Sequence, residues 1–469
     1  MHIQQLYTSC LSEAAYYIES DGEAALIDPL RDTESYIELA KSRQAEIKFI
    51  FETHFHADFV SGHLDLNEKT GAPIVFGPQT KTSFPVRIAK DGEIFKIGKI
   101  SLEVLHTPGH TLESTCYLLK DESGKPHCIF TGDTLFVGDV GRPDLSSGDR
   151  SSEELAVLLY ESLEKKIKTL PDDVIVYPAH GPGSSCGKNI GPEKATTIGI
   201  EKKSNYALLA EDKASFVKAV TEGLQSPPDY FFINARINKE GYDSLEKILE
   251  KSLHPLNPDL FQEAIKNDPD LIVLDTRQKD SFTEGFVPES VFIGLDGRFA
   301  EWAGSMLPFD QDILIVTDHG KEKETIIRLA RVGIDRVKGY LEGGIESWKK
   351  AGKQLDLVIN IEPDELAMDI PFDEHLVMLD VRKEAEYDSG HVKNAENIPL
   401  GNLKDPGNIA MLNETDNLYI YCGSGYRSVI AASILKKQGY HSLRNVIGGW
   451  NAIKEEKNIP IEKEAQALN

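Results

Sequence analysis

Four short apolar runs that each end at histidine or aspartate constrain the fold of this chain most strongly. The runs read "IKFIFET", "SLEVLHT", "CIFTG" and "VIVYP", and they are followed by His54 and His56, His110, Asp133 and His180. Runs of this length are typical of buried strands, and helical patterns such as "SSEELAVLLYESLEKKIKTL" separate some of them. The alternation predicts an α/β fold. Because α/β sheets bind ligands beyond the carboxyl ends of their strands, we expect these side chains to converge.

The loop "THFHADFVSGH" carries three of the candidate ligands within five residues, His54, His56 and Asp58. A single histidine or aspartate after a strand is usually a cap or a turn residue. Such a set spread over four strand ends instead indicates a metal site. The next residue, Phe59, has no donor atom, and His63 falls on an expected helix, where we interpret it as structural rather than as a replacement ligand.

The motifs "THFHADFVSGH", "TPGHT", "TGDTLF" and "YPAHG" resemble those of the metallo-β-lactamase superfamily, in its glyoxalase II and persulfide dioxygenase branch. For two-metal hydrolases the resemblance implies one ligand set of His54, His56 and His110, a second of Asp58, His180 and an imidazole at position 59, and Asp133 shared between them. Phe59 removes the imidazole of the second set. A mechanism that depends on a water bridging two metals is therefore not expected.

Persulfide dioxygenases resemble the chain better than these hydrolases do. The resemblance implies one Fe²⁺ per chain, held by His54, His110 and Asp133, with three pocket groups around it, His56, Asp58 and His180. A face of two histidines and one carboxylate leaves about three positions of an octahedron open, as in non-haem iron oxygenases.

Two further loops are expected to border the metal pocket. "TGDTLFVGDVGRPDL" carries Arg142 and Asp144 shortly after Asp133, and "AHGPGSSCGKN" carries Cys186 after His180. Arg142 either binds a substrate carboxylate or phosphate or pairs with Asp144. Cys186 either holds sulfane sulfur near the metal or is a small residue of a Gly- and Ser-rich loop. Both pairs of alternatives stay open at this point.

The most specific short motif of the chain is "NLYIYCGSGYRS". An apolar strand leads into Cys422, and a glycine-containing loop closes at Arg427 before the helical pattern "SVIAASILKKQG". This order predicts a cradle of backbone N–H groups at a helix N-terminus, to which Arg427 adds positive charge. Such surroundings stabilise anionic sulfur, so Cys422 and Arg427 are candidate catalytic residues. The cradle itself comprises Gly423, Ser424, Gly425 and Tyr426.

The stretch "LDVRKEAEYDSGHVKNAENIPL" with the cysteine loop and "GGW" resembles rhodanese, the sulfurtransferase fold. Asp380 and Arg382 in this stretch are expected to organise the fold. A weaker copy of the pattern precedes it, in "VLDTRQKDSFTEGFVPES" and "YLEGGIESW". There the loop reads "IVTDHGKEKET", and we align Asp318 with the cysteine and Lys323 with the arginine. A carboxylate cannot carry sulfane sulfur, so this copy is predicted to be a spacer or an interface.

Composition narrows the class of protein and of partner. The 469 residues carry a net charge of −25, which disfavours a nucleic-acid partner because such binding depends on clustered Lys and Arg. We find no signal-peptide pattern and no membrane-spanning stretch, so we expect a cytoplasmic protein without a membrane partner. Five cysteines without a Cys-x-x-Cys pair predict neither a disulfide framework nor a zinc knuckle. We expect a homo-oligomer whose size is open.

These features predict three α/β domains. A metallo-β-lactamase αβ/βα sandwich over residues 1–250 is followed by a rhodanese-like domain over 256–355, without the catalytic cysteine, and by a rhodanese domain over 360–469 that carries Cys422. Paired prolines and a polar stretch end the first region, and a linker-like segment follows it.

The combined resemblance implies an enzyme that oxidises a thiol persulfide with O₂ to sulfite and thiol, while Cys422 forms or consumes thiosulfate. The direction of that transfer is open, and so is the thiol, whether glutathione, coenzyme A or another small thiol. Two other hypotheses stand beside it. One is a zinc-dependent glyoxalase II-like thioester hydrolase, against which Phe59 argues. The other is a non-enzymatic sulfur carrier in which the metal is structural.

Overall fold

The computed structural model describes residues 1–145, 150–224 and 226–463 and divides into two compact units. The first unit comprises Met1–Ile248 together with Ile327–Ile334, and the second comprises Leu249–Ile326 together with Asp335–Asn469. Residues 464–469, the end of the last predicted domain, lie outside the described residues. Within the described part of the chain, none of the helices is long and apolar enough to cross a membrane.

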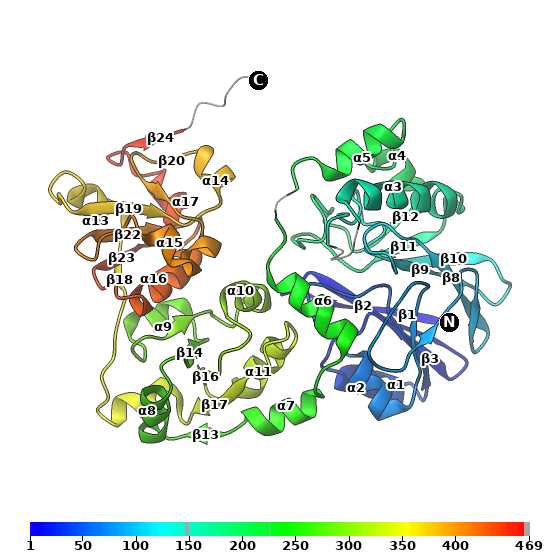
Figure 1. Ribbon diagram of the computed structural model, residues 1–469, viewed down its shortest axis with the longest axis horizontal. Coiled ribbons are helices and arrows are strands. Elements are labelled where there is room, and N and C mark those ends of the chain that lie inside the picture. The colour runs from blue at the N-terminus through cyan, green and yellow to red at the C-terminus, as the bar shows by residue number, and fades with distance from the viewer. Residues whose placement is uncertain (146–149, 225, 464–469) are drawn as a thin grey trace. The chain divides into compact units, whose positions relative to one another are not determined.

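The first unit is built on two six-stranded sheets (Figure 1). One runs in the order β1 (His2–Thr8), β2 (Glu13–Ser20), β3 (Glu23–Ile27), β4 (Glu46–Phe51), β5 (Ile74–Phe76) and β6 (Arg87–Ile88). The other runs in the order β12 (Thr196–Thr197), β11 (Ile175–Pro178), β10 (Pro126–Gly132), β9 (Thr115–Lys120), β8 (Ile100–His106) and β7 (Ile94–Ile97).

Among the described residues, seven α-helices accompany these strands along the chain. They are α1 (Glu34–Ser42), α2 (His63–Thr70), α3 (Ser152–Ser162), α4 (Ile198–Ser204), α5 (Lys213–Thr221), α6 (Tyr230–Glu240) and α7 (Leu245–Ser252). The start of α3 shows why the chain turns helical there: the side chain of Ser151 accepts from the backbone of Glu154, whose carboxylate accepts in return from the Ser151 backbone.

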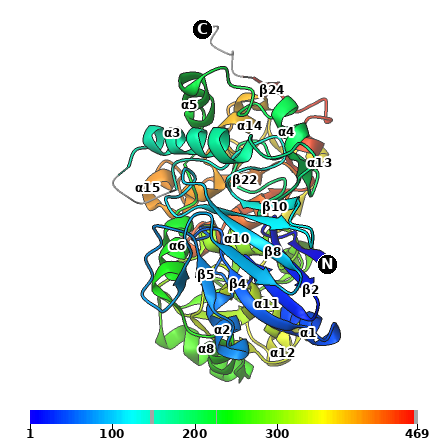
Figure 2. The same cartoon turned by 90° about the vertical axis from the view of Figure 1, so that its right-hand side faces the viewer.

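Alternation along β2 explains the layering of the first unit. Tyr16 and Ile18 lie in the core that the two sheets share, whereas Ala15 and Tyr17 pack on the opposite face, in a core that includes Tyr36 of α1. A third core joins the outer face of the second sheet to α3 and α5. Figure 2 shows α1 and α2 beside the first sheet and α3 beside the second. The predicted αβ/βα sandwich is thus confirmed.

The second unit holds two parallel five-stranded sheets with the same strand order. The first is β13 (Pro255–Leu256), β17 (Val337–Leu341), β16 (Ile313–Val316), β14 (Ile272–Asp275) and β15 (Val291–Phe292). The second is β18 (Ile359–Ile361), β23 (Leu443–Val446), β22 (Asn417–Tyr421), β19 (Leu376–Asp380) and β21 (Glu396–Asn397). The predicted internal repeat is therefore present as a duplicated α/β fold.

The helices of the repeat follow its strands. Those of the first copy are α8 (Pro258–Asn267), α9 (Lys279–Glu284), α10 (Phe299–Met306), α11 (Glu322–Ala330) and α12 (Gly344–Lys350). Those of the second are α13 (Pro363–Asp369), α14 (Glu384–Asp388), α15 (Pro406–Ile409), α16 (Arg427–Lys437) and α17 (Gly449–Ile453), and a small sheet pairs β20 (His391–Val392) with β24 (Ile461–Glu462).

A buried Asp–Arg pair marks the same corner in both copies. Arg382 binds the Asp380 carboxylate and donates to the Gly390 carbonyl at 2.7 Å. In the first copy Arg277 binds Asp275 and donates to the Gly285 carbonyl at 2.9 Å. Each arginine thus joins the end of a central strand to the turn after the next helix, the organising role predicted for Asp380 and Arg382.

Gly449, the first residue of α17, packs closely against the backbone of Cys422. Its φ is +56°, and a β-carbon there would lie 2.3 Å from the Cys422 carbonyl oxygen. We expect Gly449→Ala to cost about 1–3 kcal/mol of local stability, measured by hydrogen exchange of peptides from β22 and α16. Gly439→Ala is the control, since Gly439 also has positive φ but no atom within 4 Å of its β-position. Equal exchange in the two variants would contradict this packing argument.

Candidate functional site

Three buried clusters of ionisable side chains lie at the strand ends of the first unit. Within each cluster the potential ligand atoms lie within 4.8 Å of one another. The first cluster is His54, His110 and Asp133, the second is Asp58, His180 and Cys186, and the third is Asp28, Glu52 and His56. His54 follows β4, His110 follows β8, Asp133 follows β10 and His180 follows β11, as the apolar runs indicate. The structure therefore brings together the three residues predicted to hold iron.

The orientation of His54 is fixed by a chain of hydrogen bonds that begins at Asp28. The Asp28 carboxylate accepts from the Thr53 backbone at 2.7 Å and from the Thr53 hydroxyl at 2.8 Å. Because that hydroxyl donates to Asp28, its oxygen accepts from Nδ1–H of His54, 2.9 Å away. Nε2 of His54 keeps its lone pair, is buried and has no hydrogen-bond partner. Such an atom is suited to bind a metal ion.

His110 is fixed in the same tautomer by a different partner. Its Nδ1 lies 2.8 Å from the backbone carbonyl oxygen of Arg142, which only accepts hydrogen bonds. Nδ1 therefore carries the proton, and the lone pair on Nε2 faces Oδ2 of Asp133 at 3.4 Å. Nε2 of His54 lies 3.8 Å from the same oxygen. Two imidazole lone pairs and one carboxylate oxygen thus converge on a single point.

The electrostatics of this cluster suit a cation. Burial lowers the pKa of His54 well below its ordinary value, and the neighbouring ring of His56 adds to the effect, so the ring is neutral. Burial favours the neutral acid at Asp133, but the charge of His180 and its hydrogen bond outweigh burial and lower the pKa of that carboxyl. Oδ2 of Asp133 is buried without a hydrogen-bond partner. A divalent metal would satisfy the orphaned atoms, so the residues fit the predicted ion.

His180 links the second cluster to Asp133. Its Nδ1 lies 2.7 Å from Oδ1 of Asp133 and its Nε2 lies 2.8 Å from Oδ2 of Asp58. Burial opposes protonation, but the two carboxylates outweigh it and raise the pKa of His180 well above its ordinary value. Cys186 completes the cluster, and burial raises the pKa of its thiol, with Asp58 adding to the effect. The second cluster therefore holds one imidazolium, one carboxylate and a protonated thiol.

His56 belongs to the third cluster rather than to the first. Its Nε2 lies 3.0 Å from Oδ1 of Asp28 and 3.6 Å from Oε2 of Glu52, which also accepts from Ser61. Neither Asp28 nor Glu52 was singled out from the sequence. A signal existed for Asp28, since it ends the apolar run "AALID" at the tip of β3.

Phe59 and His63 are buried beside the third cluster. The Phe59 ring is fully buried and stacks on His56, with ring centroids 4.3 Å apart. His63 starts α2, and its Nδ1 lies 3.2 Å from Glu52 while its ring stacks on Phe84. Burial lowers the pKa of His63 to about 3. His63 thus packs as a neutral core residue, the interpretation preferred from the sequence.

A carboxyl on the strand beside His180 was also missed. Glu13 pairs with His180 through an antiparallel backbone bridge and is completely buried, and neither carboxylate oxygen has a hydrogen-bond partner. Burial raises the pKa of Glu13 well above its ordinary value, so the side chain is a neutral acid. Its sequence context, "SCLSEAAYYIES", gave no sign of this placement.

Arg142 pairs with Asp144, as one of its two predicted roles requires. Its Nε and Nη2 donate to the two oxygens of Asp144 at 2.6 and 2.7 Å, and its Nη1 donates to the Ser185 carbonyl. Its backbone N–H donates to the Cys186 carbonyl at 3.0 Å. The guanidinium therefore holds the two loops of the pocket together, and the carbonyl of the same residue orients His110.

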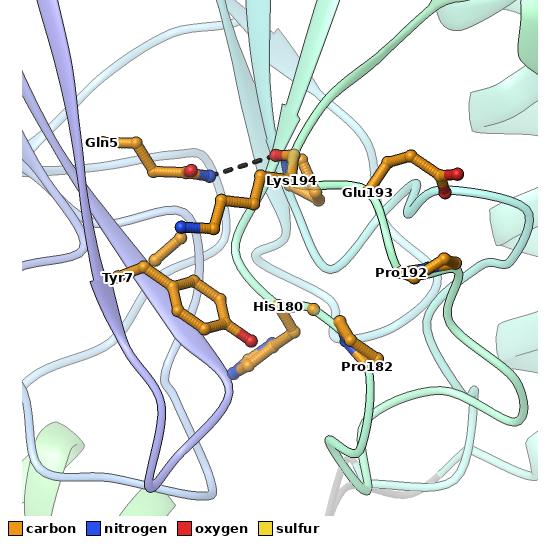
Figure 3. Close-up of a pocket in the computed structure, with 10 residues that line it drawn as sticks. Gln5, Tyr7, His180, Pro182, Pro192, Glu193 and Lys194 are labelled. Atoms are coloured by element: carbon orange, nitrogen blue, oxygen red, sulfur yellow. Dashed lines mark hydrogen bonds between the residues drawn. The ribbon is translucent and has the colours of Figure 1, made fainter.

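His180 also lines a cavity of ≈ 200 Å³ (Figure 3). Its walls include Tyr7 of β1, Gln5 and the segment Pro192 to Lys194. The Gln5 amide donates to the Lys194 carbonyl at 3.1 Å, and the Lys194 ammonium lies 5.2 Å from the centre of the Tyr7 ring. Among the described members of the three clusters, His180 alone lines this cavity.

Cys422 lies in the loop that the sequence predicted, between β22 and α16. The thiol is buried, and its Sγ accepts from the Gly425 backbone N–H at 3.2 Å. Gly425 has φ +92°, which brings its amide toward the sulfur. Gly423, Ser424 and Tyr426 complete the loop. Arg427 opens α16, but its two terminal nitrogens each donate to Glu386 at 2.7 Å, so its charge is paired.

The register of the sheets corrects the alignment of the middle copy by one residue. Asp380 pairs with Tyr421, the residue before Cys422, and Asp275 pairs with Val316. Thr317, not Asp318, therefore occupies the position of the cysteine, and Glu322, not Lys323, begins the following helix where Arg427 begins α16. A threonine hydroxyl cannot form a persulfide either, so the first copy lacks the sulfur chemistry as predicted.

Two family models match the chain. The metallo-beta-lactamase superfamily model covers residues 9–180, and the rhodanese-like domain model matches residues 257–351 and 362–456. The predicted domain boundaries at 250, 256, 355 and 360 themselves stay predictions.

The chain is also similar to solved structures and to a curated protein. A metallo-beta-lactamase from Staphylococcus aureus subsp. aureus COL is 33% identical with a TM-score of 0.65, over 73% of this chain and 98% of that one. ETHE1 from Myxococcus xanthus is 29% identical with a TM-score of 0.44, over 51% and 98%. A probable hydroxyacylglutathione hydrolase of Schizosaccharomyces pombe is 34% identical over 160 residues. That match covers 33% of this chain and 58% of the length of the hydrolase. The chain belongs to the metallo-β-lactamase superfamily and carries two rhodanese-like domains after its metallo-β-lactamase domain.

Proposed function

We propose that the first domain is a mononuclear iron persulfide dioxygenase and that Cys422 is the sulfur carrier of a coupled sulfurtransferase. In the first reaction a thiol persulfide, O₂ and water give thiol, sulfite and two protons. In the second reaction, Cys422 passes sulfane sulfur to sulfite to form thiosulfate, or takes it from thiosulfate and releases sulfite. The thiol is a small molecule such as glutathione or coenzyme A.

The observation that carries this proposal is the composition of the two inner clusters. His54, His110 and Asp133 present three orphaned or facing donor atoms to one point. The second cluster has a single imidazole ring, that of His180, and Phe59, the residue after Asp58, has no donor atom and stacks on His56. One metal ion with open coordination positions is supported over a dinuclear centre.

The residues around the cluster would set the conditions for this chemistry. Ferrous iron, when bound, supplies positions at which a persulfide and O₂ can be activated together. Asp28 with Thr53, and the Arg142 carbonyl, hold the two histidines in the tautomer that offers Nε2. His180 binds the second oxygen of Asp133 and keeps that carboxylate from turning. Phe59 keeps water from one wall of the site.

A zinc-dependent thioester hydrolase is the second candidate. The 34% identity to a probable hydroxyacylglutathione hydrolase favours it. A third hypothesis, a sulfur carrier without turnover, would need a partner protein for any product to form. Oxygen uptake and product analysis together distinguish the three hypotheses. If the chain is a dioxygenase, the purified protein with iron should consume O₂ with a persulfide and release sulfite without a partner. Hydrolysis of a glutathione thioester without O₂ uptake would instead support the hydrolase.

His110→Ala tests the ligand assignment. The variant should fall from about one bound iron per chain toward none, and O₂ uptake should fall with it, because only two ligands remain. Iron is measured by elemental analysis after anaerobic reconstitution. His63→Gln is the control, since His63 is a buried histidine near the site that belongs to none of the three clusters. Iron retained by His110→Ala, or lost by a folded His63→Gln, would contradict the assignment.

Phe59→His tests why the site holds one ion. The new imidazole would lie beside Asp58 and complete a second ligand set, so bound zinc should rise from about one to about two ions per chain in excess zinc. Oxygenase activity should fall, because Asp133 would then be shared between two cations. Phe59→Leu, which removes the ring without adding a donor, should stay at one. A ratio of one in folded Phe59→His would mean that another feature forbids the second ion.

Cys422→Ser tests the coupling of the two activities. We expect O₂ consumption to stay within about twofold of wild type while the product shifts from thiosulfate to sulfite, since a serine hydroxyl cannot form the persulfide intermediate. Both anions are quantified by chromatography, with the spontaneous reaction of sulfur and sulfite subtracted. Cys128→Ser, a change at a buried cysteine of β10, is the matched control. Unchanged thiosulfate from Cys422→Ser would assign the transfer to another residue, such as Cys186.

A further inference from the structure

The first rhodanese-like copy contacts the cysteine loop of the second copy directly. Tyr426, in the loop that follows Cys422, donates its hydroxyl to the Gly294 carbonyl at 3.0 Å, and its ring packs edge-on against Phe292. The Phe292 backbone N–H in turn donates to Ser433 of α16 at 2.9 Å, in a buried position. The two copies are therefore joined at the Cys422 site, and α9 of the first lies beside β18 of the second (Figure 1).

The charges that the second copy supplies around Cys422 are already paired. Arg427 meets both oxygens of Glu386 at 2.7 Å, and Arg382 is held by Asp380. Thiosulfate is a dianion at neutral pH, and sulfite is a mixture of its dianion and hydrogensulfite. A guanidinium whose charge is balanced by a carboxylate attracts a dianion weakly, so the loop needs a further cation to bind one at its mouth.

Lys279, the first residue of α9, supplies a cation at that place. A β-carbon built on Gly425 would lie 3.9 Å from Lys279 Nζ, and the amide of the same glycine donates to Cys422 Sγ. Because Gly425 has no side chain, nothing of its own fills the space between the ammonium and the loop. The ion pair of Lys279 is with Asp280 at 3.3 Å, a carboxylate whose side chain is 80% exposed and therefore weakly bound.

We propose that Lys279 is a substrate-binding residue of the Cys422 site, contributed by the copy that has lost its own cysteine, and that it binds the sulfonate end of sulfur oxyanions. The inference rests on the proposed sulfurtransferase function and adds to it the residue that selects dianionic substrates. The first copy is then a part of the active site as well as a support for it.

The transfer step balances without a further oxidant or reductant. The Cys422 thiolate attacks the outer sulfur of thiosulfate, the S–S bond of thiosulfate breaks, and its electron pair leaves with sulfite. Cyanide, the acceptor used in the assay, then attacks the outer sulfur of the Cys422 persulfide. That S–S bond breaks, the thiolate is restored, and thiocyanate leaves. Lys279 balances negative charge on the sulfonate during the first step.

Steady-state thiosulfate:cyanide kinetics of the full-length chain, measured without O₂, test the proposal. We expect Lys279→Ala to raise KM for thiosulfate roughly three- to tenfold, Lys279→Glu to raise it further, and Lys279→Arg to restore it, with kcat within about twofold throughout. Methanethiosulfonate carries one negative charge instead of two, so its KM should rise less. Lys338→Ala is the matched control: Lys338 is an exposed lysine of the same copy, 3.2 Å from Asp312, at the amino end of β17.

Each outcome decides between distinct claims. A wild-type chain with no thiocyanate turnover would remove the proposed sulfurtransferase function, and this inference with it. With an active wild type, an unchanged KM in Lys279→Ala and Lys279→Glu would overturn the inference alone. A fall in kcat that is equal for both donors and is not restored by Lys279→Arg would also overturn it, because it would mean that Lys279 supports the structure rather than binding the anion.

Discussion

The hydrogen bond through Nδ1 of each candidate ligand histidine is the interaction on which the candidate metal site depends. His54 is held from the first sheet, by Thr53 and through it by Asp28, whereas His110 is held by the Arg142 carbonyl of a loop after the second sheet. Turning either ring would leave a buried polar group unpaired, at a cost of about 1–3 kcal/mol. Both sheets therefore fix the direction of the lone pairs before any metal binds.

This dependence explains which parts of the site could be predicted from the sequence. The ligands follow apolar strands, and the strand ends of an α/β sandwich meet at one edge, so His54, His110 and Asp133 could be found as a set. The groups that orient them could not. The partner of His110 is a backbone carbonyl, which every residue has, and the partner of His54 is the hydroxyl of a threonine.

The loop of the first rhodanese-like copy shows a second limit of prediction from sequence, because its alignment with the Cys422 loop is ambiguous. The sequence "IVTDHGKEKE" can be set against "IYCGSGYRS" in more than one register. Pairing of Asp275 with Val316 removes the ambiguity, since the equivalent Asp380 pairs with Tyr421. A shift of one residue changes which side chain lies at the end of the strand, and here it replaces Asp318 by Thr317.

The duplicated sheets also show why a copy can lose its cysteine and keep its structure. The Asp–Arg pair that joins strand to turn is present in both copies, with nearly equal distances, although only the second copy has a cysteine in its loop. Stability and chemistry thus depend on different residues within one fold. The first copy, which has no cysteine in this loop, is in contact with Tyr426 and can therefore contribute side chains to the neighbouring site. A lysine beside an anion-binding loop is such a contribution.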